Sequence, residues 1–219
     1  MKKQKVLTRK GKALRRIGRF LAILFAVNWV FGLGLLFPLQ AIWQQQEREG
    51  ITGHMRVVDR DWVPEIGVTH FRYLMQNEKA VMLAGTNLDF YGWMGAFSTA
   101  LDCTTGEPLY VAMDSLHKDG DSVYYFWGRV DDPEIAQIDI SLCHREYVNR
   151  KYIYPEVDRL RIPQDEWMEQ DGRQFFMIRL DEWNYEPIIV SYAVALDGGG
   201  QELYRFEISE GASSHFGIG

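Results

Sequence analysis

Residues 123–130 read Val123-Tyr124-Tyr125-Phe126-Trp127-Gly128-Arg129-Val130, an almost continuous run of large apolar side chains. Branched and aromatic residues are enriched in strands, because their side chains pack well on a pleated surface. A sheet accommodates so dense an aromatic run more comfortably than any other element. The run therefore predicts a strand of a β-rich domain.

Turn signals lie on the C-terminal side of this run. Residues 131–133 read Asp-Asp-Pro, and proline presets its own backbone angle and so favours a tight turn. Residues 197–200 read Asp-Gly-Gly-Gly between two strand-like segments, 188–196 and 201–208. Aspartate and glycine accept the positive φ angles that short hairpin turns need, so these residues predict a β-hairpin.

Further segments have the branched and aromatic composition of strands, and turn residues separate them. They are residues 55–58, 67–75, 80–84, 107–113, 151–154 and 175–180. Two segments stay open: residues 88–97 fit a bulged strand or a packed loop, and residues 163–172 fit a short helix or a long turn. Eight to ten strands without alternating helices predict a mainly β fold, as an antiparallel β-sandwich or barrel-like domain.

The N-terminal part of the chain has a different character. Residues 20–39 are uncharged, and Asn28 is their only strongly polar side chain. Twenty helical residues cover about 30 Å, the thickness of a bilayer's hydrocarbon core, and no polar stripe marks the segment as a buried core helix. We therefore expect a single transmembrane helix over residues 20–43. A cleaved signal peptide is the alternative, although its apolar region is usually shorter and Leu39-Gln40-Ala41 is a poor cleavage site.

Charge gives the expected orientation. Nine of the 24 Lys and Arg residues lie in residues 1–19, which contain no acid, so 15 remain to face all 30 Asp and Glu residues. The positive-inside rule keeps a basic tail in the cytoplasm. The expected organisation is a cytoplasmic tail at 1–19, the membrane helix at 20–43, a linker at 44–53, an extracytoplasmic β domain at 54–210 and a flexible tail at 211–219.

Partners follow from the same charges. The basic tail beside an apolar helix indicates membrane lipid as the partner of residues 1–43. The part beyond the helix has a formal charge of −15, which disfavours nucleic acid and other anionic polymers. A protein partner in the cell envelope is expected, and no sequence motif predicts a cofactor.

Two elements carry a resemblance to a known group of proteins. They are the Gly-x-Val-Asp-Asp-Pro-Glu-Ile element within residues 124–140, and the closing Ala195-Leu-Asp-Gly hairpin with Tyr204-x-Phe206. In the order of its segments the chain resembles uncharacterised membrane-anchored or secreted β-domain proteins of Gram-positive bacteria. The resemblance covers less than a quarter of the chain. It implies the β fold and the extracytoplasmic compartment, and it transfers no activity and no site residue.

The two cysteines are Cys103 and Cys143. In an oxidising compartment they could form a disulfide that closes a loop of about 40 residues, worth roughly 3 to 4 kcal/mol in the entropy model. The alternative is two separate thiols. A redox role is disfavoured, because the close spacing of a Cys-x-x-Cys motif is missing.

No catalytic or metal-binding residue is predicted. The five histidines (His54, His70, His117, His144 and His215) lack the His-x-x-x-His or His-x-His spacing of metal sites. Residues 120–122 read Gly-Asp-Ser, as in one esterase family, but they follow a turn and precede a strand. The turn acids could hold Ca²⁺ but lack the spacing of a helix–loop–helix site, so solvated acids are the simpler interpretation. They are Asp114, Asp119, Asp121, Asp131, Asp132 and Glu134.

One aromatic set could line a glycan-stacking groove: Trp93, Phe97, Tyr124, Tyr125, Phe126, Trp127 and Trp183. In a two-layer sandwich about half of them would face the core. The sequence thus favours a membrane-anchored binding or accessory module without a catalytic site. The alternatives are a cell-envelope hydrolase whose site is assembled from distant strands, and a domain that binds a small ligand or Ca²⁺.

Overall fold

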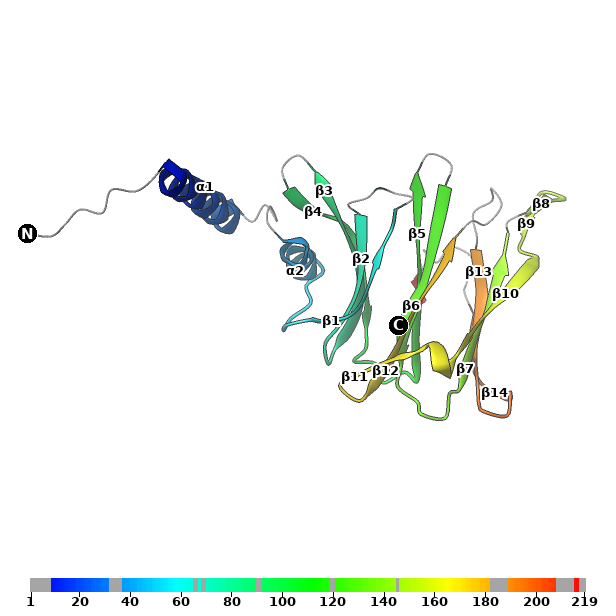
Figure 1. The fold of residues 1–219 in the computed structure, drawn as a ribbon. Coiled ribbons are helices and arrows are strands. Elements are labelled where there is room, and N and C mark those ends of the chain that lie inside the picture. Colours follow the sequence, from blue (N-terminus) through cyan, green and yellow to red (C-terminus); the bar gives the residue numbers. More distant parts are fainter. Residues whose placement is uncertain are drawn as a thin grey trace, which may run out of the picture.

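The structure of the protein is a computed structural model. It describes residues 9–31, 37–64, 67, 70–89, 92–118, 121–144, 146–181, 189–207 and 215–216. The chain is mainly β, with 57% of it in strands that pair in antiparallel sheets. The predicted β fold is therefore confirmed. Figure 1 shows two helices followed by three sheets stacked in layers.

The central sheet contains the segment 123–130. Its strand order is β11-β12-β6-β5-β15. The strands are β5 (Leu109–Lys118), β6 (Asp121–Val130), β11 (Met168–Gln170), β12 (Arg173–Asp181) and β15 (His215–Phe216). Every residue from Val123 to Val130 is buried, because other sheets cover both faces of this one.

The proximal sheet lies on the side of the helices and has the order β1-β2-β3-β4. Its strands are β1 (Arg56–Trp62), β2 (His70–Gln76), β3 (Ala80–Asp89) and β4 (Gly92–Asp102). Residues 92–97 thus form a strand, and the register shifts between Gly85 and Thr86 opposite them. Leu88 and Asp89 end β3 and lie opposite Trp93 and Gly92. Residues 88–97 are therefore neither one bulged strand nor a loop: they belong to two paired strands, β3 and a bulged β4, and residues 90–91 lie outside the described part.

The distal sheet covers the other face of the central sheet, in the order β10-β7-β13-β14. Its strands are β7 (Gln137–Cys143), β10 (Glu156–Pro163), β13 (Ile189–Leu196) and β14 (Glu202–Glu207). A small hairpin of β8 (Glu146–Val148) and β9 (Lys151–Ile153) precedes β10, and the 3₁₀ turn η1 (Gln164–Glu166) follows it. The predicted hairpin at residues 197–200 joins β13 to β14, with Gly200 at a φ of 79°.

Three apolar cores separate these layers. One lies between the central and distal sheets, around Phe126, Phe176 and Ile140. A second lies between the proximal and central sheets, around Leu74, Tyr125 and Trp127. A third lies under helix α2 on the outer face of the proximal sheet and includes Ile42, Met75 and Met82. The expected two-layer sandwich is therefore a three-sheet stack, in which the central sheet has no solvent face.

The N-terminal residues form two helices, α1 (Arg9–Phe31) and α2 (Pro38–Arg48), and residues 32–36 between them lie outside the described part. The membrane helix was expected to run through residue 43, and the linker from 44 to 53. Residues 38–43 are instead the first half of α2, whose Ala41 and Ile42 pack against the proximal sheet. Neither described helix has the length and apolarity that a membrane crossing requires.

Candidate functional site

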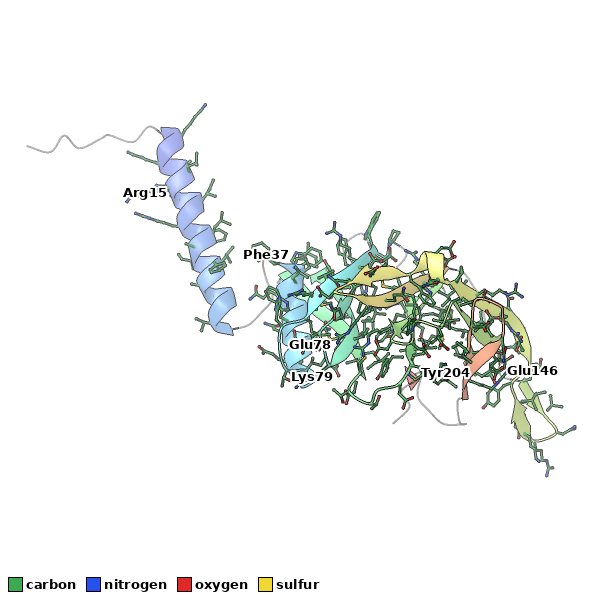
Figure 2. All side chains as sticks on the ribbon, turned by 90° about the horizontal axis from the view of Figure 1, so that it is seen from below. Arg15, Phe37, Glu78, Lys79, Glu146 and Tyr204 are labelled. Carbon is green, nitrogen blue, oxygen red and sulfur yellow. The ribbon has the colours of Figure 1, made fainter. Side chains whose placement is uncertain are left out.

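Helix α1 divides into a basic and an apolar half. Lysine and arginine residues occupy its first half, up to Arg19, and residues 20–27 carry no charge. Large apolar side chains of this half are exposed, and Phe20 and Ile23 each keep 62% of their surface in solvent. Figure 2 shows the side chains of α1, among them Arg15, surrounding a helix that stands away from the sheets. Contiguous exposed apolar surface of this kind marks a contact with a membrane or another protein.

Helix α2 is held on the proximal sheet by packing and by one specific hydrogen bond. Pro38 occupies its first turn, where the missing N–H has no cost. The Gln45 side-chain amide donates to the backbone oxygen of Phe97 at 2.8 Å. Gly95 makes this approach possible, because a Cβ there would lie 2.6 Å from Cδ of Gln45. The helix therefore belongs to the β domain and fixes the place where the chain leaves it toward α1.

An apolar groove lies where α1, α2 and strand β1 meet, with a volume of about 830 Å³. Phe25 of α1 and Phe37, Leu39 and Trp43 around the start of α2 form one side of it. Residues 57–60 of β1 and Tyr73 of β2 form the other side. Its volume lies within the range of about 300–1,000 Å³ that is usual for ligand pockets. We call it the juxtahelical groove.

Aromatic side chains continue from the groove along the outer face of the proximal sheet. Trp62 lies opposite Phe71 in the strand register, so both point to the α2 side. The Phe71 ring lies 6.4 Å from that of Tyr73 and 5.6 Å from that of Trp93, measured between centroids. Trp62 and Trp43 remain 48% and 42% exposed. Exposed tryptophan beside apolar surface is typical of proteins that contact the interface of a bilayer.

The charged groups of the groove are Arg60 and Asp59. The Arg60 backbone N–H donates to the Asp59 carboxylate at 2.8 Å, while the Arg60 side chain is exposed and lies opposite Tyr73 in the register. Burial raises the pKa of the Tyr73 phenol, and the nearby Arg60 charge partly opposes that rise. Tyr73 therefore stays a neutral phenol at neutral pH.

A second cavity, of about 600 Å³, is lined by residues 52–54, by the turn between β2 and β3 and by residues 171–173. Its lining is polar and includes His54, Glu78 and Lys79. The Asp171 carboxylate in its wall already accepts hydrogen bonds at 3.0 Å from Arg56 and from Gln76. The Asp171 carboxylate is therefore engaged with a guanidinium and an amide, and Glu78 is the other carboxylate of the lining.

Charged residues also lie in the buried layer between the proximal and central sheets. One row of residues crosses the proximal sheet, in which each residue lies opposite the next in the strand register. The row consists of Asp61, Arg72, Gly85 and Phe97. Arg72 is fully buried and its guanidinium lies over the Phe97 ring, 3.4 Å from Cζ to the centroid. Gly85 leaves room for it, since a Cβ there would meet Arg72 Nη1 at 1.7 Å.

A second row faces the first one from the central sheet and consists of Asp114, Tyr125 and Arg179. The Tyr125 hydroxyl donates to the Asp61 carboxylate at 2.5 Å, and Arg179 donates to the same oxygen at 3.2 Å. Burial lowers the pKa of Arg72 to about 9, against the attraction of Asp114 and Tyr125, so Arg72 remains a cation at neutral pH. These facing rows fix the two sheets against each other. We assign them a structural role.

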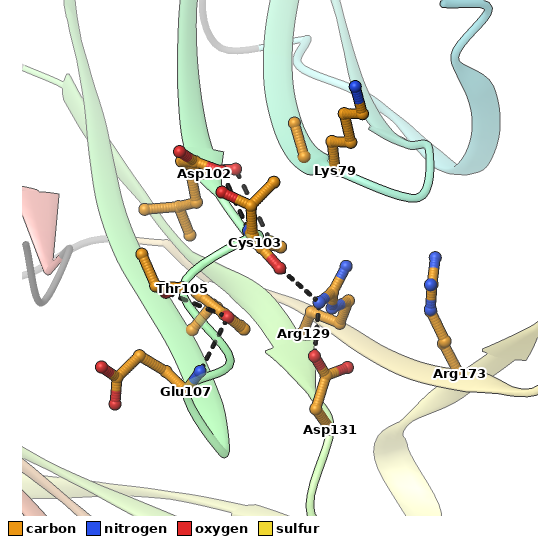
Figure 3. Close-up of polar contacts among 12 residues, drawn as sticks. Lys79, Asp102, Cys103, Thr105, Glu107, Arg129, Asp131 and Arg173 are labelled. Atoms are coloured by element: carbon orange, nitrogen blue, oxygen red, sulfur yellow. Dashed lines mark hydrogen bonds and ion pairs between the residues drawn. The ribbon is translucent and has the colours of Figure 1, made fainter.

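The cysteines are free and buried. Cys103 packs in the core between the proximal and central sheets, and Cys143 ends β7 in the distal sheet. The structure thus has the separate thiols rather than the disulfide. Burial raises the pKa of Cys103 to about 11, although the nearby Arg129 opposes this. Figure 3 shows Cys103 beside Arg129, which donates to the Cys103 carbonyl at 3.3 Å and also pairs with Asp131.

The predicted histidines do not converge. His54 is exposed and its ring lies 5.8 Å from that of Trp43. His70 is buried on β2, and His144 pairs with Glu146 at 2.7 Å on the distal side. His117 and His215 lie in strands β5 and β15. In the part of the chain that the structure describes, no three acidic, histidine or cysteine side chains are placed to hold a metal ion.

The turn acids are also separated. Asp114 is half-buried beside Thr99, Asp131 pairs with Arg129, and Asp132 accepts from Tyr204 at 2.6 Å. Glu134 is exposed. Asp121 and Ser122 of the Gly-Asp-Ser residues open β6, where Asp121 lies opposite Lys118. That pairing agrees with the hairpin interpretation, while Asp119 and Gly120 themselves lie outside the described residues.

The proposed glycan-stacking set is mostly core. Tyr124, Tyr125, Phe126 and Trp127 keep at most 2% of their surface exposed. The expectation that half of such a run would be available was wrong, because it assumed two layers and the strand lies in the middle of three. Phe97 lies beneath Arg72, and the Trp93 ring is tilted by 55° against the Phe71 ring on the outer face of the proximal sheet. Trp183 lies outside the described residues.

The sequence analysis missed the groove and the buried arginine. The one available signal for the groove was Trp43, an aromatic residue directly after the apolar segment and before three glutamines. The signal for the buried network was Arg72, a charge inside an otherwise apolar strand. Neither a protein-family model, nor a curated protein, nor a solved structure matches this chain.

Proposed function

We propose that this chain is a membrane-anchored module whose β domain is held at the outer surface of the membrane by its N-terminal helix. The apolar residues from Phe20 up to the start of α2 enter the bilayer, and the basic residues before them remain on the cytoplasmic side. The module binds or supports a protein of the cell envelope. No catalytic role is assigned to any residue.

One observation carries the proposal: the exposed apolar half of α1 follows directly on its basic half. Apolar surface costs about 25 cal/mol per Å² in water, so side chains as large and as exposed as Phe20 and Ile23 favour transfer into lipid. The arginines of the first half favour anionic headgroups, each by about 1 kcal/mol. The exposed aromatic residues Phe37 and Trp43 support the same orientation, since they line the groove together with Phe25 of α1.

Alkaline carbonate extraction of membranes tests this function. The intact chain should stay in the membrane pellet, because only lipid-inserted proteins resist this treatment. A double change in α1, Ile23→Lys with Val27→Lys, should release most of the protein into the supernatant. Tyr147→Lys with Val148→Lys is the matched control, since it also replaces two exposed apolar residues but in the hairpin farthest from α1. Release of the unaltered chain by carbonate would refute the anchor.

The partner is tested by crosslinking in intact membranes followed by mass spectrometry. The proposal predicts at least one envelope protein that is recovered reproducibly with the full chain. Recovery of no such protein would contradict a binding role. The alternative, a hydrolase, would use the polar cavity that contains His54, where Asp171 is bonded to Arg56 and Gln76.

A further inference from the structure

We propose that the juxtahelical groove binds one acyl chain of a bilayer phospholipid, with Arg60 contacting the phosphate of its headgroup. This inference rests on the proposed function, because it takes α1 to be in the membrane. It goes further in naming a ligand class and a binding site for it. The groove would then hold a lipid that belongs to the protein, in addition to the general contact that any anchored helix makes.

The shape and composition of the groove favour an acyl chain. Its walls are made mostly of apolar side chains, with Phe37 and Leu39 on the helical side and Val57 and Val58 on the strand side. Phe37 is 58% exposed, so the apolar lining is continuous with the outside. Water in such a groove finds few hydrogen-bond partners, whereas a flexible hydrocarbon chain buries apolar surface on both walls.

The position of the groove favours a lipid of the bilayer as the source. Phe25, on the apolar half of α1, is part of the lining, so the groove is continuous with the surface that we place in the membrane. Figure 2 shows Phe37 where α1 approaches the domain. A phospholipid beside α1 therefore needs to move only one of its chains sideways to enter the groove. A soluble ligand would instead have to reach it past the membrane surface.

The charge at the groove favours a phosphate headgroup. Arg60 is the one cation in the described lining, and the one carboxylate there, Asp59, accepts a hydrogen bond from the Arg60 backbone N–H. Among the described residues no ion pair engages the Arg60 side chain itself. A guanidinium is well suited to phosphate oxygens, because it presents several N–H donors in one plane. Tyr73, opposite Arg60 in the register, is 5% exposed and forms part of the wall. The side chain of Arg60 is thus available to a ligand, while its neighbours are fixed.

Native mass spectrometry of the full chain tests the proposal. The protein is reconstituted in nanodiscs of equal parts phosphatidylglycerol and phosphatidylcholine, transferred into mild detergent, and its retained lipid is counted. We expect one phospholipid per chain. Val57→Trp fills the groove and should reduce retention at least tenfold. Val148→Trp is the control, since it places the same side chain on an exposed strand at the far end of the molecule and should retain the lipid.

A second pair of variants tests the headgroup contact without altering the apolar packing. Arg60→Gln should lower phospholipid retention about tenfold, as expected for loss of one charge-assisted contact of about 1.4 kcal/mol. Arg161→Gln, an exposed arginine on the distal sheet, should change nothing. Because Arg60 is exposed, its replacement leaves the fold intact, so a loss of lipid cannot be attributed to unfolding.

Carbonate resistance and phospholipid retention together distinguish a failure of the lipid site from a failure of the membrane anchor. If the chain resists carbonate but retains no phospholipid, or if Val57→Trp retains as much as the unaltered protein, the groove is not a lipid site and the anchor stands. If the chain does not resist carbonate, the proposed function itself fails. An excess of palmitate provides the last comparison. Displacement of the phospholipid by this free fatty acid, with no effect of Arg60→Gln, would overturn the assignment to a bilayer phospholipid.

Discussion

At the scale of single residues, the fold depends on one arginine and one glycine whose contact could not be predicted from the sequence. Arg72 and Gly85 are 13 positions apart in the chain, and the register of β2 and β3 places them opposite each other. The Arg72 guanidinium has no hydrogen-bond partner among the described residues and is stabilised by the Phe97 ring and by the charge of Asp114. The guanidinium fits beside residue 85 because glycine has a hydrogen atom where other residues have a Cβ.

The substitution Gly85→Ala should therefore destabilise the protein by about 2–3 kcal/mol, a typical cost of overpacking a core. The new methyl group would displace a guanidinium that is fully buried and cannot move into water. Denaturant titration of the two proteins measures this difference. Gly198→Ala is the control, because no atom lies within 4 Å of its Cβ position, and it should change stability by less than about 0.5 kcal/mol. Equal effects at the two positions would contradict the packing described for Arg72.

The buried thiol of Cys103 gives a prediction for pH. Burial raises its pKa to about 11, whereas the thiol of an unfolded chain ionises near 9. The folded protein therefore keeps a proton that the unfolded chain loses, so this contribution is complete below pH 9 and is lost as the pH rises toward 11. The free energy of unfolding should fall through this window by about 1.4 kcal/mol per pH unit, up to roughly 2–3 kcal/mol.

Comparison with Cys103→Ala isolates this contribution, because the tyrosines titrate in both proteins. The variant should show a smaller loss of stability between pH 9 and 11 when both are unfolded with urea. Thiol labelling supplies the complementary measurement: the two cysteines should react slowly in the native protein and fully in denaturant without reductant. Identical pH slopes, or a denatured protein with no reactive thiol, would contradict two free, buried cysteines.

At the scale of elements, the sequence predicted those strands whose identity depends on local composition. The run at β6 and the hairpin between β13 and β14 are of this kind. Strand β10 was missed, because charged residues alternate along it and its edge position leaves them in solvent. The sequence of residues 163–172 fits a short helix or a long turn, and the structure has a 3₁₀ turn there, followed by the short strand β11. Their pairing with β12 is a tertiary effect that composition does not encode.

Helix α2 was also misassigned, since its apolar residues continue those of α1 in the sequence. Only the contact with the proximal sheet distinguishes them. We predict that Gln45→Ala will lower stability by about 1–2 kcal/mol, because the backbone oxygen of Phe97 loses its donor in a partly buried contact. Hydrogen exchange should show lost protection in α2 before the sheets are affected. Glu47→Ala, an exposed residue of the same helix, is the control and should leave exchange unchanged.

At the scale of the whole molecule, the three-sheet stack explains why the aromatic run is not a ligand-binding surface. The sequence predicted the mainly β class, but the number of layers depends on which strands pair across long distances. The groove could not be predicted from the sequence either, because it forms only where α1, α2 and β1 meet. Exposed large apolar side chains lie on α1 and around the groove, and a second group lies on the distal side, in β8, β9, β10 and β14.

The position of α1 in lipid is measured most directly by the depth of a label on it. The native thiols are buried, so a single added cysteine, Ile23→Cys, can be labelled with a fluorophore in the full chain and reconstituted in phosphatidylglycerol vesicles. Nitroxide lipids with the spin label deep in the acyl chain should quench this fluorophore more strongly than lipids with the nitroxide at the headgroup. The reverse order is expected for Lys12→Cys. Quenching of the Ile23→Cys label mainly from the headgroup, or by neither lipid, would contradict the account.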